Sequence, residues 1–177
     1  MTNAVNLAAV GSNANSGGTL ITSGTAVAST SGTSIDFTSI PSWVKRITVM
    51  FDAVSLNGSS NLRFQLGDSG GVETTGYVSV FSYNGASNNG STSSTGFDNT
   101  GAGGASLAVS GQIVISLLSA STNTWTVMGM LGAAGSAFTL LTTGSKSLSA
   151  TLDRVRITTV NGTDTFDAGS INILYEG

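Results

Sequence analysis

The longest strand-like stretch of the chain is V-K-R-I-T-V-M-F-D-A-V-S-L, at residues 44–56. Its side chains are expected to alternate between two faces, with Ile47, Val49, Phe51 and Ala53 on one face and the residues between them on the other. Successive side chains of a β-strand point to opposite sides, so this period of two predicts a long strand that packs against a core. The stretch therefore favours a β-sheet protein.

The same alternation recurs along the chain, between segments rich in Gly, Ser and Asn. Immediately after the long strand, N-G-S-S at 57–60 predicts a hairpin turn. Further strands are expected at 34–37, 62–66, 76–83, 107–118, 124–131, 138–141, 147–160 and 170–176. No amphipathic helical pattern interrupts them. Short strands at regular spacing predict an all-β, antiparallel β-sandwich, and a jelly roll is the expected arrangement.

The first 32 residues differ from the rest in composition. Residues 1–32 are mostly Asn, Ala, Ser, Gly and Thr, and they are predicted to form an extended N-terminal arm before a β-sandwich domain at 33–177. Within the arm, residues 24–31 are compatible with one edge strand. An arm of this kind buries too little area alone to offset its own entropy, so we expect it to lie on its own domain or on a neighbour. The expected anchors are Val5, Leu7, Val10 and Leu20.

The composition excludes several kinds of chemistry. The chain has no Cys and no His, so disulfides and thiol chemistry are excluded and only oxygen ligands remain for a metal. Charged residues make up 8% of the chain and the net charge is -3, which gives no attraction to a nucleic-acid backbone or an anionic membrane. Neither a secretory signal nor a membrane-spanning run is expected from the hydropathy pattern. We therefore predict no cofactor, no nucleic-acid partner and no membrane partner.

One short motif matches a catalytic one. Residues 67–71 read G-D-S-G-G, as in the segment around the nucleophile of chymotrypsin-like serine proteases. A serine nucleophile needs an adjacent base, and without histidine the only nitrogen bases of this kind are Lys45 and Lys146. The alternative is that Asp-Ser-Gly-Gly forms the turn after the strand at 62–66. We therefore predict a turn at Ser69 and no enzymatic activity.

Aromatic residues form a candidate binding site. Tyr77, Phe81 and Tyr83 share one face of a predicted strand, and Phe97 is the only large apolar residue in the polar stretch 84–105. Exposed aromatic rings stack on sugars, so these four residues are candidates for glycan or subunit contacts. Aromatic residues in phase on a strand more often belong to a core or a subunit interface than to a glycan site. The stretch 84–105 itself is predicted to be a long loop.

Charged residues near the C-terminal end have two interpretations each. Asp164 and Asp167 carry oxygen ligands of the kind that calcium binds, but their spacing is not that of an EF-hand, and an Asx turn explains them more simply. No metal site is therefore predicted. Arg154 and Arg156 share one strand face and are expected to form ordinary ion pairs, for which the candidate partners are Asp52 and Asp153.

Three phrases of the sequence resemble structural proteins of tailed bacteriophages and prophages. They are I-P-S-W-V-K-R-I-T-V-M-F at 40–51, Q-L-G-D-S-G-G-V-E-T-T-G-Y at 65–77 and the segment 152–176, which is the most specific of the three. Related proteins are tail-fibre or virion proteins, and the resemblance covers most of residues 33–177. It implies a virion component with a β-sandwich fold, of a kind often assembled as a homotrimer, without enzymatic residues.

The resemblance leads to two functional hypotheses. The first is a non-enzymatic capsid decoration (cement) protein or short fibre subunit that binds neighbouring capsid or tail proteins. The sequence shows no shaft repeats before the domain, which favours such a small subunit over a long fibre. The second is a tail-fibre receptor-binding module that recognises host surface glycans. Either protein would be made in the cytoplasm of the host bacterium and would act on the exposed surface of the virion.

Overall fold

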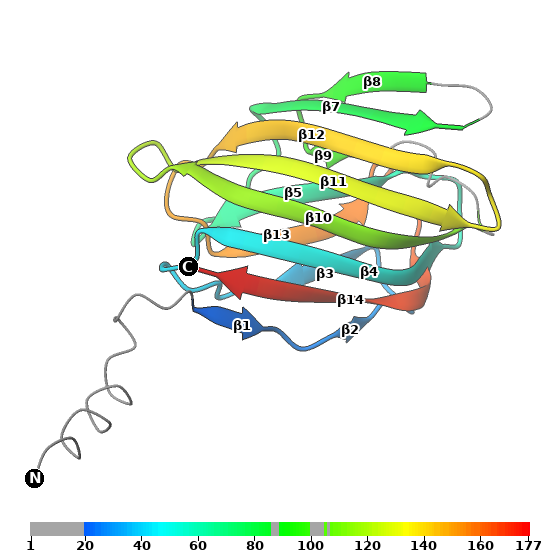
Figure 1. Ribbon diagram of the computed structural model, residues 1–177, viewed down its shortest axis with the longest axis horizontal. Helices are drawn as coiled ribbons and strands as arrows, with labels where there is room; N and C mark the ends of the chain where they lie inside the picture. Colours follow the sequence, from blue (N-terminus) through cyan, green and yellow to red (C-terminus); the bar gives the residue numbers. More distant parts are fainter. Residues whose placement is uncertain (1–19, 86–88, 100–104, 106) are drawn as a thin grey trace, which may run out of the picture.

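The structure is a computed structural model that describes residues 20–85, 89–99, 105 and 107–177. These residues form an all-β fold of fourteen strands in two antiparallel sheets, and none of them is helical. The two sheets lie one behind the other as two layers (Figure 1). The prediction of an all-β, antiparallel sandwich is therefore confirmed.

The larger sheet has nine strands in the order β1-β14-β4-β10-β11-β12-β7-β8, with β2 also paired to β14. Their bounds are β1 (Ile21–Ser23), β2 (Val27–Ala28), β4 (Arg46–Leu56), β7 (Tyr77–Asn84), β8 (Asn89–Ser93), β10 (Ala108–Ser119), β11 (Thr124–Ala134), β12 (Thr139–Ser147) and β14 (Phe166–Glu176). Three of these strands, β10, β11 and β12, form a meander of consecutive strands. The jelly-roll arrangement is not confirmed.

The smaller sheet has five strands in the order β3-β13-β5-β6, with β9 also paired to β5. Their bounds are β3 (Ser34–Phe37), β5 (Leu62–Asp68), β6 (Gly71–Val72), β9 (Phe97–Asp98) and β13 (Arg154–Thr159). Along β13, Val155 and Ile157 are fully buried while Arg154 and Arg156 are partly exposed on the other side. The period of two in the sequence predicted this alternation correctly.

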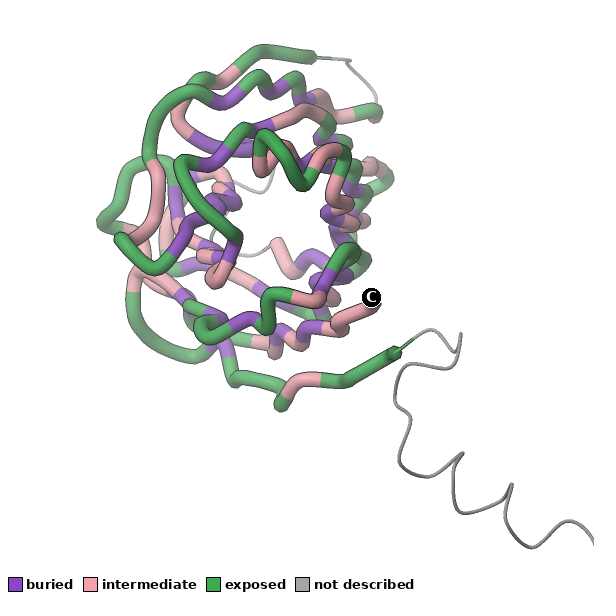
Figure 2. Tube along the Cα trace, turned by 90° about the vertical axis from the view of Figure 1, so that its left-hand side faces the viewer, coloured by how far each residue is buried: buried purple, intermediate pink, exposed green. Residues whose placement is uncertain are grey.

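The core fills the space between the two sheets. Figure 2 shows that the buried residues of the trace line the interior while exposed residues lie outside. Phe51 of β4 and Phe64 of β5 meet across the layers edge to face, with ring centroids 5.6 Å apart. Burial of large apolar side chains on both inner faces is the main favourable contribution to folding.

A β-bulge changes the phase of β4 near its end. Ala53 has a φ of 49°, and the register of β4 with β10 and with β14 shifts at this point. A bulge adds one residue to one strand, so Val54 points into the core while Ala53 is exposed. The prediction that Ala53 shares the face of Phe51 is therefore wrong. Gly169 lies opposite, where a Cβ would be 2.4 Å from the carbonyl oxygen of Ala53.

The stretch 84–105 contains two strands, so the prediction of one long loop is wrong for its described residues. The polar strand β8 pairs with the edge of β7, and β9 pairs with β5 of the smaller sheet. Backbone hydrogen bonds are sufficient to place a polar edge strand that has no apolar face. Phe97 of β9 is fully buried and contacts the ring of Tyr77, with centroids 5.0 Å apart.

The C-terminal part of the predicted arm lies on its own domain. Both β1 and β2 pair with β14, so an edge strand within 24–31 is confirmed at β2. The hydroxyl of Ser29 is buried and donates a hydrogen bond to the carbonyl of Ala168 at 2.7 Å. Leu20 exchanges two backbone hydrogen bonds with Gly177, at 3.3 and 3.1 Å, and its side chain remains exposed. The other expected anchors, Val5, Leu7 and Val10, lie outside the described residues.

Candidate functional site

Half of the exposed large apolar side chains among the described residues gather on the outer side of the larger sheet. Val78, Val80, Met128, Met130 and Leu141 form this group, which we call the outer apolar face. Met128 is paired with Thr143, which is paired with Val80, and Met130 is paired with Leu141. Paired residues of adjacent strands point to the same side, so these side chains form one continuous surface over β7, β12 and β11. Met128 is 70% exposed and Val78 is 67% exposed.

The outer apolar face carries no charge. The only charged residue of β7, β10, β11 and β12 is Lys146, which is buried on the opposite side of the sheet. Two hollows of about 370 Å³ each lie on this face, and Met128 and Val114 line both of them. Flexible methionine side chains beside hollows suit an adaptable contact surface.

The outer apolar face is absent from the sequence-based predictions, although the sequence contains a signal for it. Strand β11 reads T-W-T-V-M-G-M-L, in which Trp125, Val127 and Leu131 point into the core. Met128 and Met130 occupy the alternate positions, where polar residues are expected if that face is in water. Apolar residues at successive positions of a strand, and so on both of its faces, are therefore the signal for this second apolar surface.

The predicted aromatic contacts are mostly in the core. Tyr77, Phe81 and Phe97 are all buried in this chain: the period of two places Tyr77 and Phe81 on the inner face of β7, and β9 carries Phe97 into the core. Tyr83 is half-buried and packs edge to face against Phe138, with ring centroids 6.0 Å apart. These aromatic rings therefore offer no shared stacking surface.

Ser69 lies in an exposed two-residue turn between β5 and β6, as the sequence predicted. The neighbouring Asp68 accepts a hydrogen bond from the backbone N–H of Gly70 at 2.7 Å, and one from the hydroxyl of Ser149 at 2.6 Å. The motif G-D-S-G-G thus builds a hairpin in which the aspartate fixes the turn and links it to the loop after β12.

A polar cluster joins the two sheets near this turn. Lys146 forms an ion pair with Glu73 and lies over the ring of Tyr77, with its Nζ 5.5 Å from the centroid. The hydroxyl of Tyr77 accepts a hydrogen bond from the N–H of Leu66 at 2.8 Å and donates one to the carbonyl of Glu73 at 2.8 Å. Burial raises the pKa of Tyr77 well above its usual value. Because these groups satisfy one another, the cluster is structural.

Three carboxyl groups have pKa values below their usual range. Hydrogen bonds from the Ser149 hydroxyl and the Gly70 N–H lower the pKa of Asp68. Burial raises the pKa of Glu73, but hydrogen bonds from Lys146 and Ser149 outweigh it, so that the net shift is downward. The pKa of Asp164 is also lowered, by hydrogen bonds from the Asn161 side chain and the Ser60 N–H.

These shifts predict a loss of stability in acid. A carboxyl group with a lowered pKa in the folded state binds a proton more tightly when the chain is unfolded. Its contribution is complete above the unfolded pKa, 3.8 for Asp and 4.5 for Glu, and is lost as pH falls through the lower folded value. We expect a constant urea midpoint between about pH 6 and 8, since the chain has no histidine, and a falling midpoint below about pH 4.5. An unchanged midpoint at about pH 3 would contradict the prediction.

The Asx turn of this segment is formed by Asn161, and Asp164 links that turn to the loop between β4 and β5. The Asn161 side-chain oxygen accepts hydrogen bonds from the N–H groups of Thr163 and Asp164, each at 3.0 Å. The carboxylate of Asp164 accepts hydrogen bonds from the Ser60 N–H and the Asn161 side chain, both at 2.7 Å. Within the described ranges, no group of three or more acidic side chains is placed to hold a metal ion.

The arginines of the smaller sheet form ion pairs. Arg154 pairs with the predicted partner Asp153 at 2.7 Å. Arg156 pairs with Asp36 of the neighbouring strand β3 through two hydrogen bonds of 2.7 Å, and not with Asp52, which lies on the other sheet. These pairs are partly exposed and contribute little stability individually.

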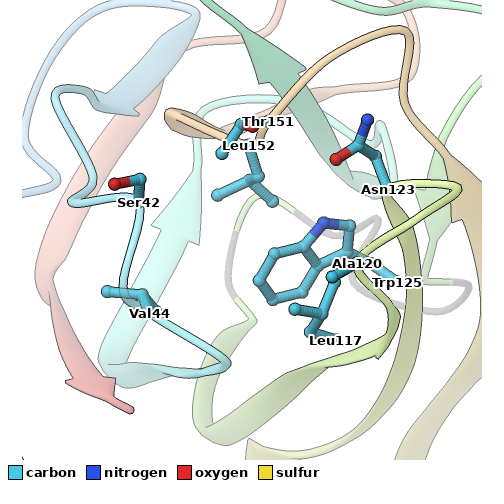
Figure 3. A pocket seen from close by; sticks show the side chains of 8 residues that line it. All are labelled: Ser42, Val44, Leu117, Ala120, Asn123, Trp125, Thr151 and Leu152. Carbon is cyan, nitrogen blue, oxygen red and sulfur yellow. The ribbon is translucent and has the colours of Figure 1, made fainter.

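A pocket of about 120 Å³ lies at the end of the sandwich where β10 ends and β11 begins (Figure 3). Trp125 at its side is only 3% exposed, and its indole N–H has no hydrogen-bond partner among the described residues. The residues that line the pocket are Ser42, Val44, Leu117, Ala120, Asn123, Trp125, Thr151 and Leu152.

Comparison with known proteins gave no match to a protein-family model, a curated protein or a solved structure. None of the described residues belongs to a helix long and apolar enough to cross a membrane. The molecule is thus defined as an all-β sandwich with an uncharged outer face and a small pocket at one end.

Proposed function

We propose that the protein is a non-enzymatic structural subunit of a tailed-phage virion, of the capsid decoration or short fibre type. The resemblance of three sequence phrases to phage virion proteins supports the virion assignment. The outer apolar face carries the structural role, because a large uncharged surface is typical of a protein that acts through contact. The occupant that we propose for this face is further copies of the same chain.

The charge pattern supports self-association. Residues that lie on a closed symmetry axis are next to their own copies, so that a charge there would face a like charge. Strands β7, β10, β11 and β12 avoid this repulsion because their only charged residue is buried. The hollows beside Met128 are further suited to receive apolar side chains of another copy.

The size of the face is adequate for the centre of an interface. Three strands at about 4.8 Å spacing, and about five residues at 3.3 Å along each, define a footprint on the order of 240 Å². A standard interface buries about 800 Å² per partner, with an apolar centre inside a polar rim. Ser82, Gln112, Ser116 and Thr126 lie around the apolar group and would form such a rim. The resemblance to trimeric phage proteins favours three copies.

Light scattering coupled to size exclusion tests the self-association. We expect the wild-type chain to elute with the mass of a homotrimer, and the double variant Met128→Lys/Met130→Lys to elute as a monomer with an unchanged circular dichroism spectrum. The matched control is Leu118→Lys/Val160→Lys, which places the same charges at exposed apolar positions outside the outer apolar face. A monomeric wild type, or equal dissociation of the control, would contradict the proposal.

The location of the protein on an intact particle tests the virion assignment. Immunogold electron microscopy of purified phage is expected to label the head for a decoration protein and the tail for a short fibre. Absence of the protein from washed particles would exclude both. The second hypothesis, a receptor-binding module for host glycans, loses its buried aromatic candidates but gains support from the pocket at Trp125.

A further inference from the structure

We propose that the pocket at Trp125 binds the acetamido group of an N-acetylated sugar. The pocket lies at the end of the sandwich, where its lining comes from Ser42 and Val44, from the turn between β10 and β11 with the adjoining strand ends, and from the loop 148–152, and Trp43 is not part of the lining. Its occupancy does not depend on self-association or on the place of the protein in a virion. The two proposals can therefore fail separately.

The indole N–H of Trp125 is the main indication of a ligand. A buried donor without an acceptor is costly, and native structures rarely keep one without a partner. In Figure 3 the nitrogen edge of the ring faces the side of the pocket where Asn123 and Leu152 lie. A ligand oxygen in the pocket would supply the missing acceptor.

The chemistry of the other lining residues selects a neutral amide. Among the described residues that line the pocket none is charged, and transfer of an ion into such a site is unfavourable. Asn123 offers a side-chain oxygen that can accept a hydrogen bond from a ligand N–H. Val44, Leu117 and Leu152 provide an apolar wall for a methyl group. An acetamido group combines a carbonyl oxygen, an N–H and a methyl group in one small unit.

The volume and the rim favour a sugar as the carrier of this group. A cavity of 120 Å³ holds about four water molecules, which is comparable to the size of an acetamido group but not of a whole sugar ring. The ring would therefore lie at the mouth. Ser42 and Thr151 are exposed there and present hydroxyl groups that can hydrogen-bond to the hydroxyls of a sugar. The chain of an acetylated lysine has no hydroxyl groups to bond to Ser42 and Thr151, which would stay bonded to water.

Titration of the wild-type protein with N-acetylglucosamine, followed by the indole N–H signals in proton–nitrogen NMR, tests the proposal. The variants Trp125→Phe and Trp43→Phe assign the two indole signals. We expect N-acetylglucosamine to shift the Trp125 signal saturably with a millimolar dissociation constant, since the buried group is small. Glucose, which lacks the amide, should leave the signal unchanged.

Variants distinguish the contribution of the indole hydrogen bond to binding from the contribution of the shape of the pocket. Trp125→Phe keeps an aromatic ring but removes the N–H. We expect this variant to bind N-acetylglucosamine about tenfold more weakly or worse, and the backbone amide signals report this binding. Trp43→Phe is the matched control and should bind as the wild type does. Asn123→Gly tolerates the positive φ of 47° at this position and should also weaken binding.

Three outcomes would overturn the proposal. The first is the absence of a saturable shift with N-acetylglucosamine, which would mean that water alone fills the pocket. The second is equal binding of glucose, which would exclude recognition through the amide. The third is stronger binding of Nε-acetyl-lysine than of N-acetylglucosamine, which would assign the pocket to acetylated peptides and not to sugars.

Discussion

Replacing Arg63 by methionine is expected to lower the free energy of unfolding by about 3–5 kcal/mol, because it leaves a buried carboxylate without its partner. Arg63 of β5 and Asp98 of β9 form two parallel hydrogen bonds of 2.6 and 2.8 Å, and the Asp98 side chain is only 6% exposed. The stem of Arg63 also packs on Gly96, where a Cβ would be 2.6 Å from the Cγ of the arginine. Urea unfolding followed by circular dichroism measures the change.

The matched control is Arg156→Met, which breaks the pair with Asp36. That pair has the same two-bond geometry, but its side chains are 37% and 34% exposed, so we expect a loss of only about 0–1 kcal/mol. The double variant Arg63→Met/Asp98→Leu should recover much of the loss, because it also removes the buried charge. Equal losses in the two single variants would show that burial does not determine the effect.

Phe97→Ala is expected to lower the free energy of unfolding by about 3–5 kcal/mol, the range for removal of a fully buried phenylalanine. The ring is completely buried, contacts Tyr77, and lies so close to Gly144 that a Cβ there would be 3.1 Å from it. The surrounding strands belong to both sheets, which limits their collapse into the space left behind. Differential scanning calorimetry and urea unfolding both report this loss.

Phe138→Ala is the control for this prediction. Phe138 is also an aromatic residue in contact with a tyrosine, but it is half-buried beside the β11–β12 hairpin. Its removal leaves a surface depression that water can fill, so we expect a loss of about 1 kcal/mol. If Phe97→Ala cost no more than Phe138→Ala, then β9 would not be part of the core in solution.

The sequence predicted the regular strands well because a single physical pattern controls them. Along β13 and β7 the side chains of one face are buried and those of the other are not, and a period of two is enough to recognise this. The reversal of phase at Ala53 could not be recognised, because alanine seldom adopts a positive φ and the residue that accommodates the bulge, Gly169, is distant in sequence.

The candidate sites were harder to predict than the strands. Arg63 and Asp98 are 35 residues apart in the sequence. They come together only in the folded protein, where β9 pairs with β5. The outer apolar face needs the register of three strands, β7, β12 and β11, before its members come together. The Trp125 pocket needs three turns that meet at one end of the sandwich. Composition could exclude classes of chemistry, but it could not bring these residues together.

The position of β14 has a consequence for how the protein is made. This strand pairs with β1, β2 and β4, whose residues precede it by more than a hundred positions. During translation β4 therefore lacks one neighbour until residues 166–176 leave the ribosome, and its open edge is able to pair with other nascent chains. The larger sheet is complete only after β14 has been synthesised, so we infer slow folding dominated by contacts distant in sequence.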